Sequence, residues 1–155
     1  MPRRPGTCYA ENIVTTHYRA TFTSDLRNVA LARKSIAGFA TVCGFSESEV
    51  ADIRLAAGEA LSNAVEHGRG TRSSGFSVAC SYDNATLVVE VRDSGTGFVS
   101  PIEVGTIEPD ERGRGFGIFL MRRLMDDVTF VRNGTAVRMV RRQSEYAGTA
   151  TSPQP

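Results

Sequence analysis

The pattern of apolar and polar positions along the chain predicts strands, where the two kinds of residue alternate, and helices, where apolar residues recur every three or four positions. We expect strands at 17–22, 76–82, 86–92, 128–132 and 135–142, and helices at 25–42, 46–68 and 117–127. The predicted strands and helices are interspersed along the chain, which indicates an α/β fold.

Local signals place the ends of the first two helices. Ser24 is a plausible N-cap of the first helix, and Gly44 is its expected stop. We expect that helix to turn a set of apolar residues toward the core, namely Leu26, Val29, Ala30, Ile36 and Ala37. Ser46 and Glu49 have the spacing of a capping box, which predicts the start of the second helix.

Turn and loop signals separate the remaining elements. Asp83-Asn84 is expected to turn between two strands, and Asn133-Gly134 is a strong signal for the last hairpin. Residues 69–75 are rich in Gly and Ser and predict a loop. Residues 98–112 have no hydrophobic period, and a loop of that length inside a compact domain is usually functional.

Composition favours one intracellular domain. The chain has 155 residues and 41% hydrophobic content, enough for a single core. We expect a flexible N-terminus at 1–12, the domain at 13–143 and a disordered tail at 144–155. The 18 basic and 17 acidic residues balance, which argues against nucleic acid and anionic membranes as partners. Three cysteines without CxxC spacing and no signal or membrane-spanning run favour the cytoplasm.

A polar face on the second helix is the first candidate for chemistry. Residues 58–68 read GEALSNAVEHG and place Glu59, Asn63 and His67 four positions apart. A step of four residues advances about 40° around a helix, so the three side chains share one face. They border an apolar stripe made of Ile53, Ala56, Ala57, Ala60, Leu61 and Ala64. Polar groups there either cap the core or line a pocket.

Two glycine-rich segments have the composition of ligand-binding loops. Asp93, Gly95 and Gly97 follow a predicted strand, where glycine lets the backbone approach a ligand closely. Residues 113–117 read GRGFG and lead straight into a helix. The backbone N–H groups of such a loop and the positive end of the helix suit phosphate groups.

Spacing argues against other readings of these loops. An EF-hand is disfavoured because its third and twelfth positions would be Gly95 and Val104. GxGxG after a loop does not fit a dinucleotide fold, and the sequence has neither a P-loop nor the HRD and DFG motifs of eukaryotic-type kinases. The arginines at 122–123 and 138–142 lack the interleaved aromatic residues of a nucleic-acid platform.

In this order, ExxxN on a helix, DxGxG after a strand, GxGxG before a helix and a late GT resemble the nucleotide-binding boxes of the GHKL (Bergerat) ATP-binding superfamily. Within it, GEALSNAVEHG, VRDSGTGF, RGRGFGIFLMRRLMDDV and GTAVRMVRR are similar to the bacterial anti-sigma-factor serine kinases. The resemblance covers roughly residues 13–142. It implies an α/β two-layer sandwich, a mixed sheet with helices on one face, and ATP held between helices and a lid at about 98–114.

The resemblance also implies roles for single residues. Asn63 would coordinate Mg²⁺ through its amide oxygen, and Glu59 would be general base or orienting group for the hydroxyl that attacks the γ-phosphate. Asp93 would accept the exocyclic amine of adenine, with Thr135 supporting it. Gly95 and Gly97 would let the chain pass close to the base.

The phosphates would be held by the loop before the third helix. The residues implied there are Arg112, Gly113, Arg114, Gly115, Phe116 and Gly117. The glycines would wrap the phosphates, and either arginine could neutralise charge on the γ-phosphate. His67 matches the family box, but a role in the pocket wall and a helix-end contact with terminal carbonyls remain equally open.

The function implied by the resemblance is that of an ATP-dependent protein serine kinase in transcription regulation. It would phosphorylate a STAS-type antagonist protein, sequester a sigma factor and act as a cytoplasmic homodimer, with its partners near the first helix and the lid. The alternative is an ATP-binding or sequestering module without phosphotransfer, which would need no base at Glu59. The ATP domain of a histidine kinase is disfavoured, because no helix with a phosphoacceptor histidine precedes the domain and His17 falls in a predicted strand.

Overall fold

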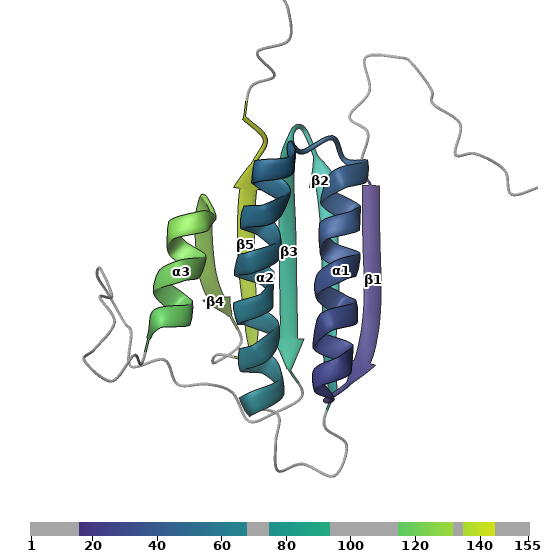
Figure 1. The fold of residues 1–155 in the computed structure, drawn as a ribbon, viewed down its shortest axis with the longest axis vertical. Helices are drawn as coiled ribbons and strands as arrows, with labels where there is room; N and C mark the ends of the chain where they lie inside the picture. Colours follow the sequence, from purple (N-terminus) through teal and green to yellow (C-terminus); the bar gives the residue numbers. More distant parts are fainter. Residues whose placement is uncertain (1–15, 68–74, 94–114, 132–134, 145–155) are drawn as a thin grey trace, which may run out of the picture.

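A computed structural model describes residues 16–67, 75–93, 115–131 and 135–144. Its elements are β1 (Thr16–Thr23), α1 (Leu26–Val42), α2 (Glu47–His67), β2 (Gly75–Asp83), β3 (Thr86–Asp93), α3 (Phe116–Leu124), β4 (Asp127–Val131) and β5 (Ala136–Arg142). The strands form one sheet in the order β1-β2-β3-β5-β4. All three helices cover the same face of that sheet (Figure 1). The two-layer α/β sandwich is confirmed.

Every pairing between the described strands is antiparallel. The mixture of strand directions that the resemblance implied is therefore not found in the described part of the sheet. The order is explained by the connections, because β2 and β3 form one hairpin and β4 and β5 lie next to each other at the other end of the sheet. β5 then pairs with β3, which places the start of β5 beside the end of β3.

The core lies between the helices and the inner face of the sheet. The predicted stripe of α2 is confirmed: Ile53, Ala56, Ala57, Ala60, Leu61 and Ala64 are all buried. They belong to one cluster with inward residues of the sheet, among them Val78, Val89 and Met139. Four alanines in the stripe let the backbone of α2 lie close to the strands, which fixes the position of its polar face.

The predicted start of α1 is wrong by one residue. Asp25 is the N-cap, and its carboxylate accepts a hydrogen bond from the backbone N–H of Arg27 at 2.8 Å. The hydroxyl of Ser24 is buried and has no partner among the described residues. The Asp25 carboxylate also forms a salt bridge with Arg27, with Oδ2 3.0 Å from Nη2, and a serine cannot form one. Gly44 ends the helix as predicted, with φ at 90°.

The predicted buried face of α1 is partly wrong as well. Val29 and Ile36 are buried, but Leu26 is 66% exposed, Ala30 is exposed and Ala37 is half-buried. The buried set is Val29, Ala32, Ile36, Phe39 and Ala40. These residues follow a regular three-and-four spacing from Val29, and Leu26, the first residue of the helix, is not among them.

The turn between β2 and β3 lies one residue later than predicted. Asn84 and Ala85 occupy it, with φ values of 48° and 58°. Positive φ at both central positions is the mark of a type I′ turn, one of the two usual two-residue hairpin loops. Asn adopts that conformation readily, and the strand pairing holds Ala85 in it through the hydrogen bond from the N–H of Gln143 to the Ala85 carbonyl, 2.7 Å long.

The third helix is shorter than predicted. It ends at Leu124, and Met125 has extended backbone with φ −109° and ψ 153°. Val128, the first residue of the strand predicted at 128–132, lies in β4 and is buried opposite Met139. The helix predicted to reach residue 127 ends three residues earlier, because Asp127 already pairs with Val140 of β5.

Other predictions lie outside the described residues. They concern the flexible ends at 1–12 and 145–155, the loops at 69–74 and 98–112, the lid at 98–114 and the turn at Asn133-Gly134. None of the helices in the described ranges is long and apolar enough to cross a membrane.

Glu49 joins the start of α2 to the segment after β5. The predicted capping box is confirmed, since the N–H of Ser46 donates to Glu49 Oε2 at 2.9 Å and the N–H of Glu49 donates to Ser46 Oγ at 3.3 Å. The N–H of Ser144 donates to Glu49 Oε1 at 2.7 Å. Burial alone would raise the pKa of Glu49, but these N–H donors outweigh it and lower the pKa from 4.5 to about 2.

We therefore expect Glu49→Gln to lower the free energy of unfolding at pH 7 by about 1–3 kcal/mol. The side-chain NH₂ of Gln would face one of the backbone N–H groups that now donate to the carboxylate, so that N–H would lose its acceptor. A carboxylate with a depressed pKa stabilises above its unfolded value and loses that effect as the pH falls. The gap between parent and variant should thus close between pH 4.5 and about 2. Urea unfolding across this range measures it. The exposed Glu47→Gln is the control, and a gap that persists at low pH contradicts the account.

Two helical glycines differ in the space around them. A β-carbon at Gly38 would meet no atom within 4 Å, whereas one at Gly58 would lie 3.3 Å from Cδ of Arg33. Gly38→Ala should therefore raise the free energy of unfolding by about 0.5–1 kcal/mol through helix propensity. Gly58→Ala should gain less, since the Arg33 side chain that lies over it must move. Thermal unfolding of both variants tests this, and equal gains would contradict it.

Candidate functional site

The elements that carry the predicted motifs meet at one end of the molecule. α2 and β3 end there, and α3 and β5 begin there, at the lower end of Figure 1. Asp93, the last residue of β3, donates its backbone N–H to the carbonyl of Thr135 at 2.8 Å. Antiparallel pairing of β3 with β5 therefore brings together two residues that the sequence places 42 positions apart.

Glu59 of α2 lies against the first turn of α3. A β-carbon placed on Gly117 would lie 2.7 Å from Glu59 Oε2, 3.6 Å from its Cδ and 3.7 Å from its Cβ. The Glu59 side chain thus lies beside Gly117, on the side where a β-carbon would project. Two of the predicted motifs, ExxxN and GxGxG, are in direct contact through these residues.

Asn63 follows Glu59 by one helical turn on the same side of α2. Both side chains are half-buried, whereas the alanines and Leu61 on the core side are buried. The position of both at the rim of the core, open in part to solvent, is what the sequence predicts for a pocket wall. His67 is the last residue of α2, and the position of its side chain is outside the description.

The N-terminus of α3 has the geometry of an anion site. Gly115 is its N-cap with φ at 84°, a left-handed conformation that favours glycine. The first turn of α3 contains no acidic residue, and its leading N–H groups have no partner within the helix. Phe116 is 50% exposed beside this turn, with its ring 6.3 Å from that of Phe119. A helix end of this kind favours phosphate oxygens.

The remaining predicted site residues, Gly95, Gly97, Arg112, Gly113 and Arg114, lie outside the described residues. Their roles stay predictions. The described part of the site comprises Glu59, Asn63, Asp93, Gly115, Phe116, Gly117 and Thr135. It contains the base candidate, the metal ligand candidate and the adenine-side pair.

The described residues fit Mg²⁺ bound together with a nucleotide better than a metal held by protein alone. No group of three or more His, Cys, Asp or Glu side chains in the described ranges is placed to hold a metal ion. Mg²⁺ commonly takes one or two protein oxygens and completes its shell with phosphates and water. The amide oxygen of Asn63 can supply one such ligand.

The described cysteines are unsuited to nucleophilic catalysis. Cys43 is half-buried and Cys80 is buried, and both are free thiols. Burial raises the pKa of Cys80 to about 12, so this thiol stays protonated at neutral pH.

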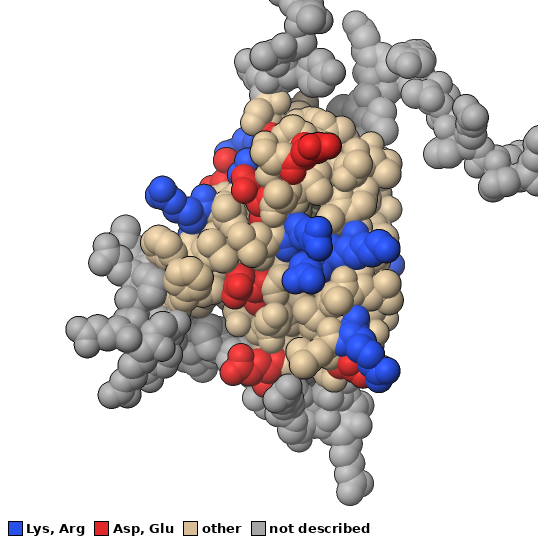
Figure 2. Space-filling view, in the orientation of Figure 1, with Lys and Arg blue, Asp and Glu red and all other residues tan. Residues whose placement is uncertain are grey.

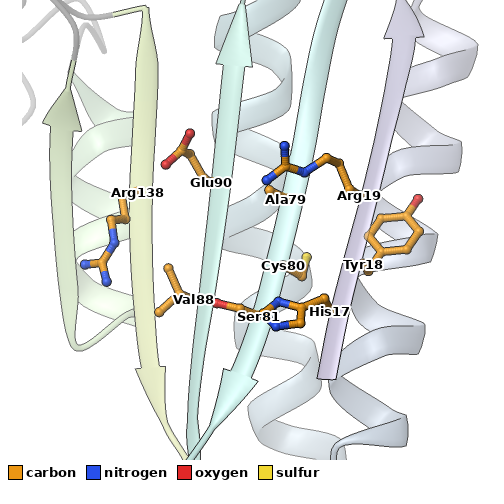
Figure 3. Close-up of a pocket in the computed structure, with 9 residues that line it drawn as sticks. All are labelled: His17, Tyr18, Arg19, Ala79, Cys80, Ser81, Val88, Glu90 and Arg138. Atoms are coloured by element: carbon orange, nitrogen blue, oxygen red, sulfur yellow. The ribbon is translucent and has the colours of Figure 1, made fainter. Parts of the chain in front are cut away.

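A hollow of about 620 Å³ lies elsewhere, across the face of the sheet opposite the helices. His17 and Arg19 of β1, Ser81 of β2, and Glu90 and Arg138 from the neighbouring strands lie around it (Figure 3). None of the motif residues within the described ranges lines it. Sequence reasoning missed this hollow, although the small residues Ala79 and Ser81 alternate on one side of β2 between longer side chains.

Comparison with known proteins supports a functional site at the end of the molecule that carries the motifs. The histidine kinase-like ATPase domain family matches residues 22–141, and the chain belongs to that family. All four motifs fall within the match. The fold, the arrangement of the motifs and the family match therefore all indicate a histidine kinase-like ATPase domain.

Within that family, the chain is similar to serine-protein kinases and anti-sigma factors. The chain is 36% identical over 109 residues to the serine-protein kinase RsbW of Listeria innocua, covering 64% of this chain and 69% of that protein. It is 28% identical over 128 residues to the anti-sigma F factor of Clostridium novyi, covering 76% and 88%. In fold it is similar to the crystal structure of the RsbU and RsbW domains of Rv1364c from Mycobacterium tuberculosis. That match has a TM-score of 0.60 and 17% identity, and it covers 83% of this chain and 32% of that one.

Proposed function

We propose that this chain is an ATP-dependent protein serine kinase that acts as an anti-sigma factor. It phosphorylates a serine on a STAS-type antagonist protein and sequesters a sigma factor. The names of its relatives, a serine-protein kinase and an anti-sigma factor, support this function. The observation that carries the catalytic part is the Glu59 carboxylate lying against the first turn of α3, where phosphates are favoured.

The transfer step follows from that geometry. The serine hydroxyl of the antagonist attacks the γ-phosphorus of ATP as Glu59 accepts the hydroxyl proton. A new serine oxygen–phosphorus bond forms, the bond from the γ-phosphorus to the bridging oxygen breaks, and ADP leaves. Asn63 would hold Mg²⁺, which supplies positive charge to the phosphate oxygens.

The other site residues bind and orient ATP. Asp93 accepts the exocyclic amine of adenine and is supported by Thr135, whose carbonyl already fixes the Asp93 backbone. Gly95 and Gly97 let the chain pass close to the base. The phosphates lie in the loop before α3, against Gly113, Gly115 and Phe116, with Arg112 or Arg114 neutralising the γ-phosphate.

The helix face is the proposed surface for protein partners. The large apolar side chains that are exposed among the described residues all lie on the three helices: Leu26, Leu31, Val42, Leu55 and Phe116. Lys and Arg gather over the middle of α1 and α2 on the same face (Figure 2). The placement of all these side chains on the helices favours the helix side of the molecule as the contact surface. The chain acts in the cytoplasm as a homodimer, as the family resemblance implies.

One assay tests the proposed function. The chain is incubated with Mg²⁺, ATP labelled on the γ-phosphate and each STAS-type protein encoded beside its gene. Label should appear on one antagonist and be absent from the same antagonist with its acceptor serine changed to alanine. ATP binding without any labelled protein would contradict the kinase and favour the binding module. Absence of ATP binding would contradict the kinase and an ATP-binding module alike, and would leave only a module that sequesters a partner.

A further inference from the structure

Gly117 stands in an unusual position for a glycine. It is the second residue of α3, after Phe116, in a helix that continues to Leu124. Its φ is not in the left-handed region, unlike those of Gly44 and Gly115. Alanine would therefore suit the backbone and would favour the helix. Backbone conformation does not explain the glycine.

Space explains it. A β-carbon on Gly117 would lie 2.7 Å from Glu59 Oε2, closer than any real carbon–oxygen contact without a bond. The atom in the way is the free end of a flexible side chain, so the fold can accept a β-carbon if the carboxylate moves. The same substitution at Gly38 in α1 would meet no atom within 4 Å.

We infer that Gly117 is a positioning residue for the base Glu59, keeping clear the place that the Glu59 carboxylate occupies beside the N-terminus of α3. This rests on the proposed function, in which Glu59 is the base. It gives Gly117 a role different from wrapping the phosphates, because the space left by its missing side chain is filled by Glu59. In this role the effect of the glycine on transfer passes through the carboxylate.

Gly117→Ala separates these roles. The variant should fold with a melting temperature equal to or above that of the parent, and its affinity for Mg·ATP should change by less than about twofold. The single-turnover rate of phosphotransfer should fall about 10- to 100-fold, since a shift of about 1 Å in a catalytic group has an effect of that size. Gly38→Ala is the matched control and should transfer at the parent rate.

A double-mutant cycle tests that the effect passes through Glu59. In the Glu59→Gln background, Gly117→Ala should lower the residual rate by less than about twofold, because there is no base left to displace. A purely structural or phosphate-binding role would make the two effects multiply. Weakened ATP affinity at an unchanged rate, or equal rate losses in both backgrounds, overturns the inference.

A second readout does not depend on the reaction. The carbon-13 signal of the Glu59 side-chain carboxyl, followed by NMR without nucleotide, should shift in Gly117→Ala and stay unchanged in Gly38→Ala. An unchanged signal in both variants overturns the inference, whatever the kinase assay shows. Absence of transfer in the parent contradicts the proposed function alone, because the NMR comparison still decides whether Gly117 positions the carboxylate.

Discussion

Glu59→Gln should slow phosphotransfer by about two to four orders of magnitude and leave ATP bound, which is the usual effect of removing a positioned general base. Gln has the shape of Glu and keeps the contact along Gly117, so the site should stay assembled. Single-turnover transfer and calorimetric titration with Mg·ATP give the two quantities separately.

The exposed Glu47→Gln, at the other end of α2, is the control for that variant. It should transfer phosphate at the parent rate. Transfer by Glu59→Gln at the parent rate would remove Glu59 from the mechanism, and loss of ATP binding would assign it to the binding of nucleotide.

Asp93→Ala should weaken ATP binding about 5- to 150-fold and GTP binding much less. The loss of a buried polar pairing costs about 1–3 kcal/mol. Adenine presents an amine donor to the carboxylate where guanine presents a carbonyl, which the carboxylate repels. The parent should therefore prefer ATP, and the variant should lose most of that preference. Titration calorimetry with both nucleotides measures it.

Asp83→Ala is the control, because Asp83 is exposed at the far end of the β2–β3 hairpin. It should bind ATP as the parent does. Equal ATP affinity in Asp93→Ala and the parent would show that another group reads the adenine.

The second helix and the motifs along the chain could be predicted from the sequence because each depends only on the spacing of residues close together in the chain. The apolar stripe of α2 is long and regular, and the capping box from Ser46 to Glu49 fixes where it begins. The strands β1, β2 and β3 alternate, and their predicted ranges differ from the observed ones by one residue at each end at most.

The errors lie where local pattern allows two answers. Ser24 and Asp25 are both good N-caps, and the choice depends on Arg27, which reaches back to the carboxylate. The third helix is predicted to reach residue 127, but it ends at Leu124 because Asp127 pairs with Val140 of β5. The contact of Glu59 with Gly117 depends on how α3 packs against α2, which no local spacing contains.

The described fold offers two places for a ligand, and one measurement decides between them. Amide NMR spectra of the chain with and without Mg·ATP report each residue separately. The account predicts shifts in the last turns of α2, at the end of β3 and in the first turn of α3, with none at His17, Arg19 or Ser81. Shifts confined to the hollow around those three residues would contradict the assignment of the nucleotide site.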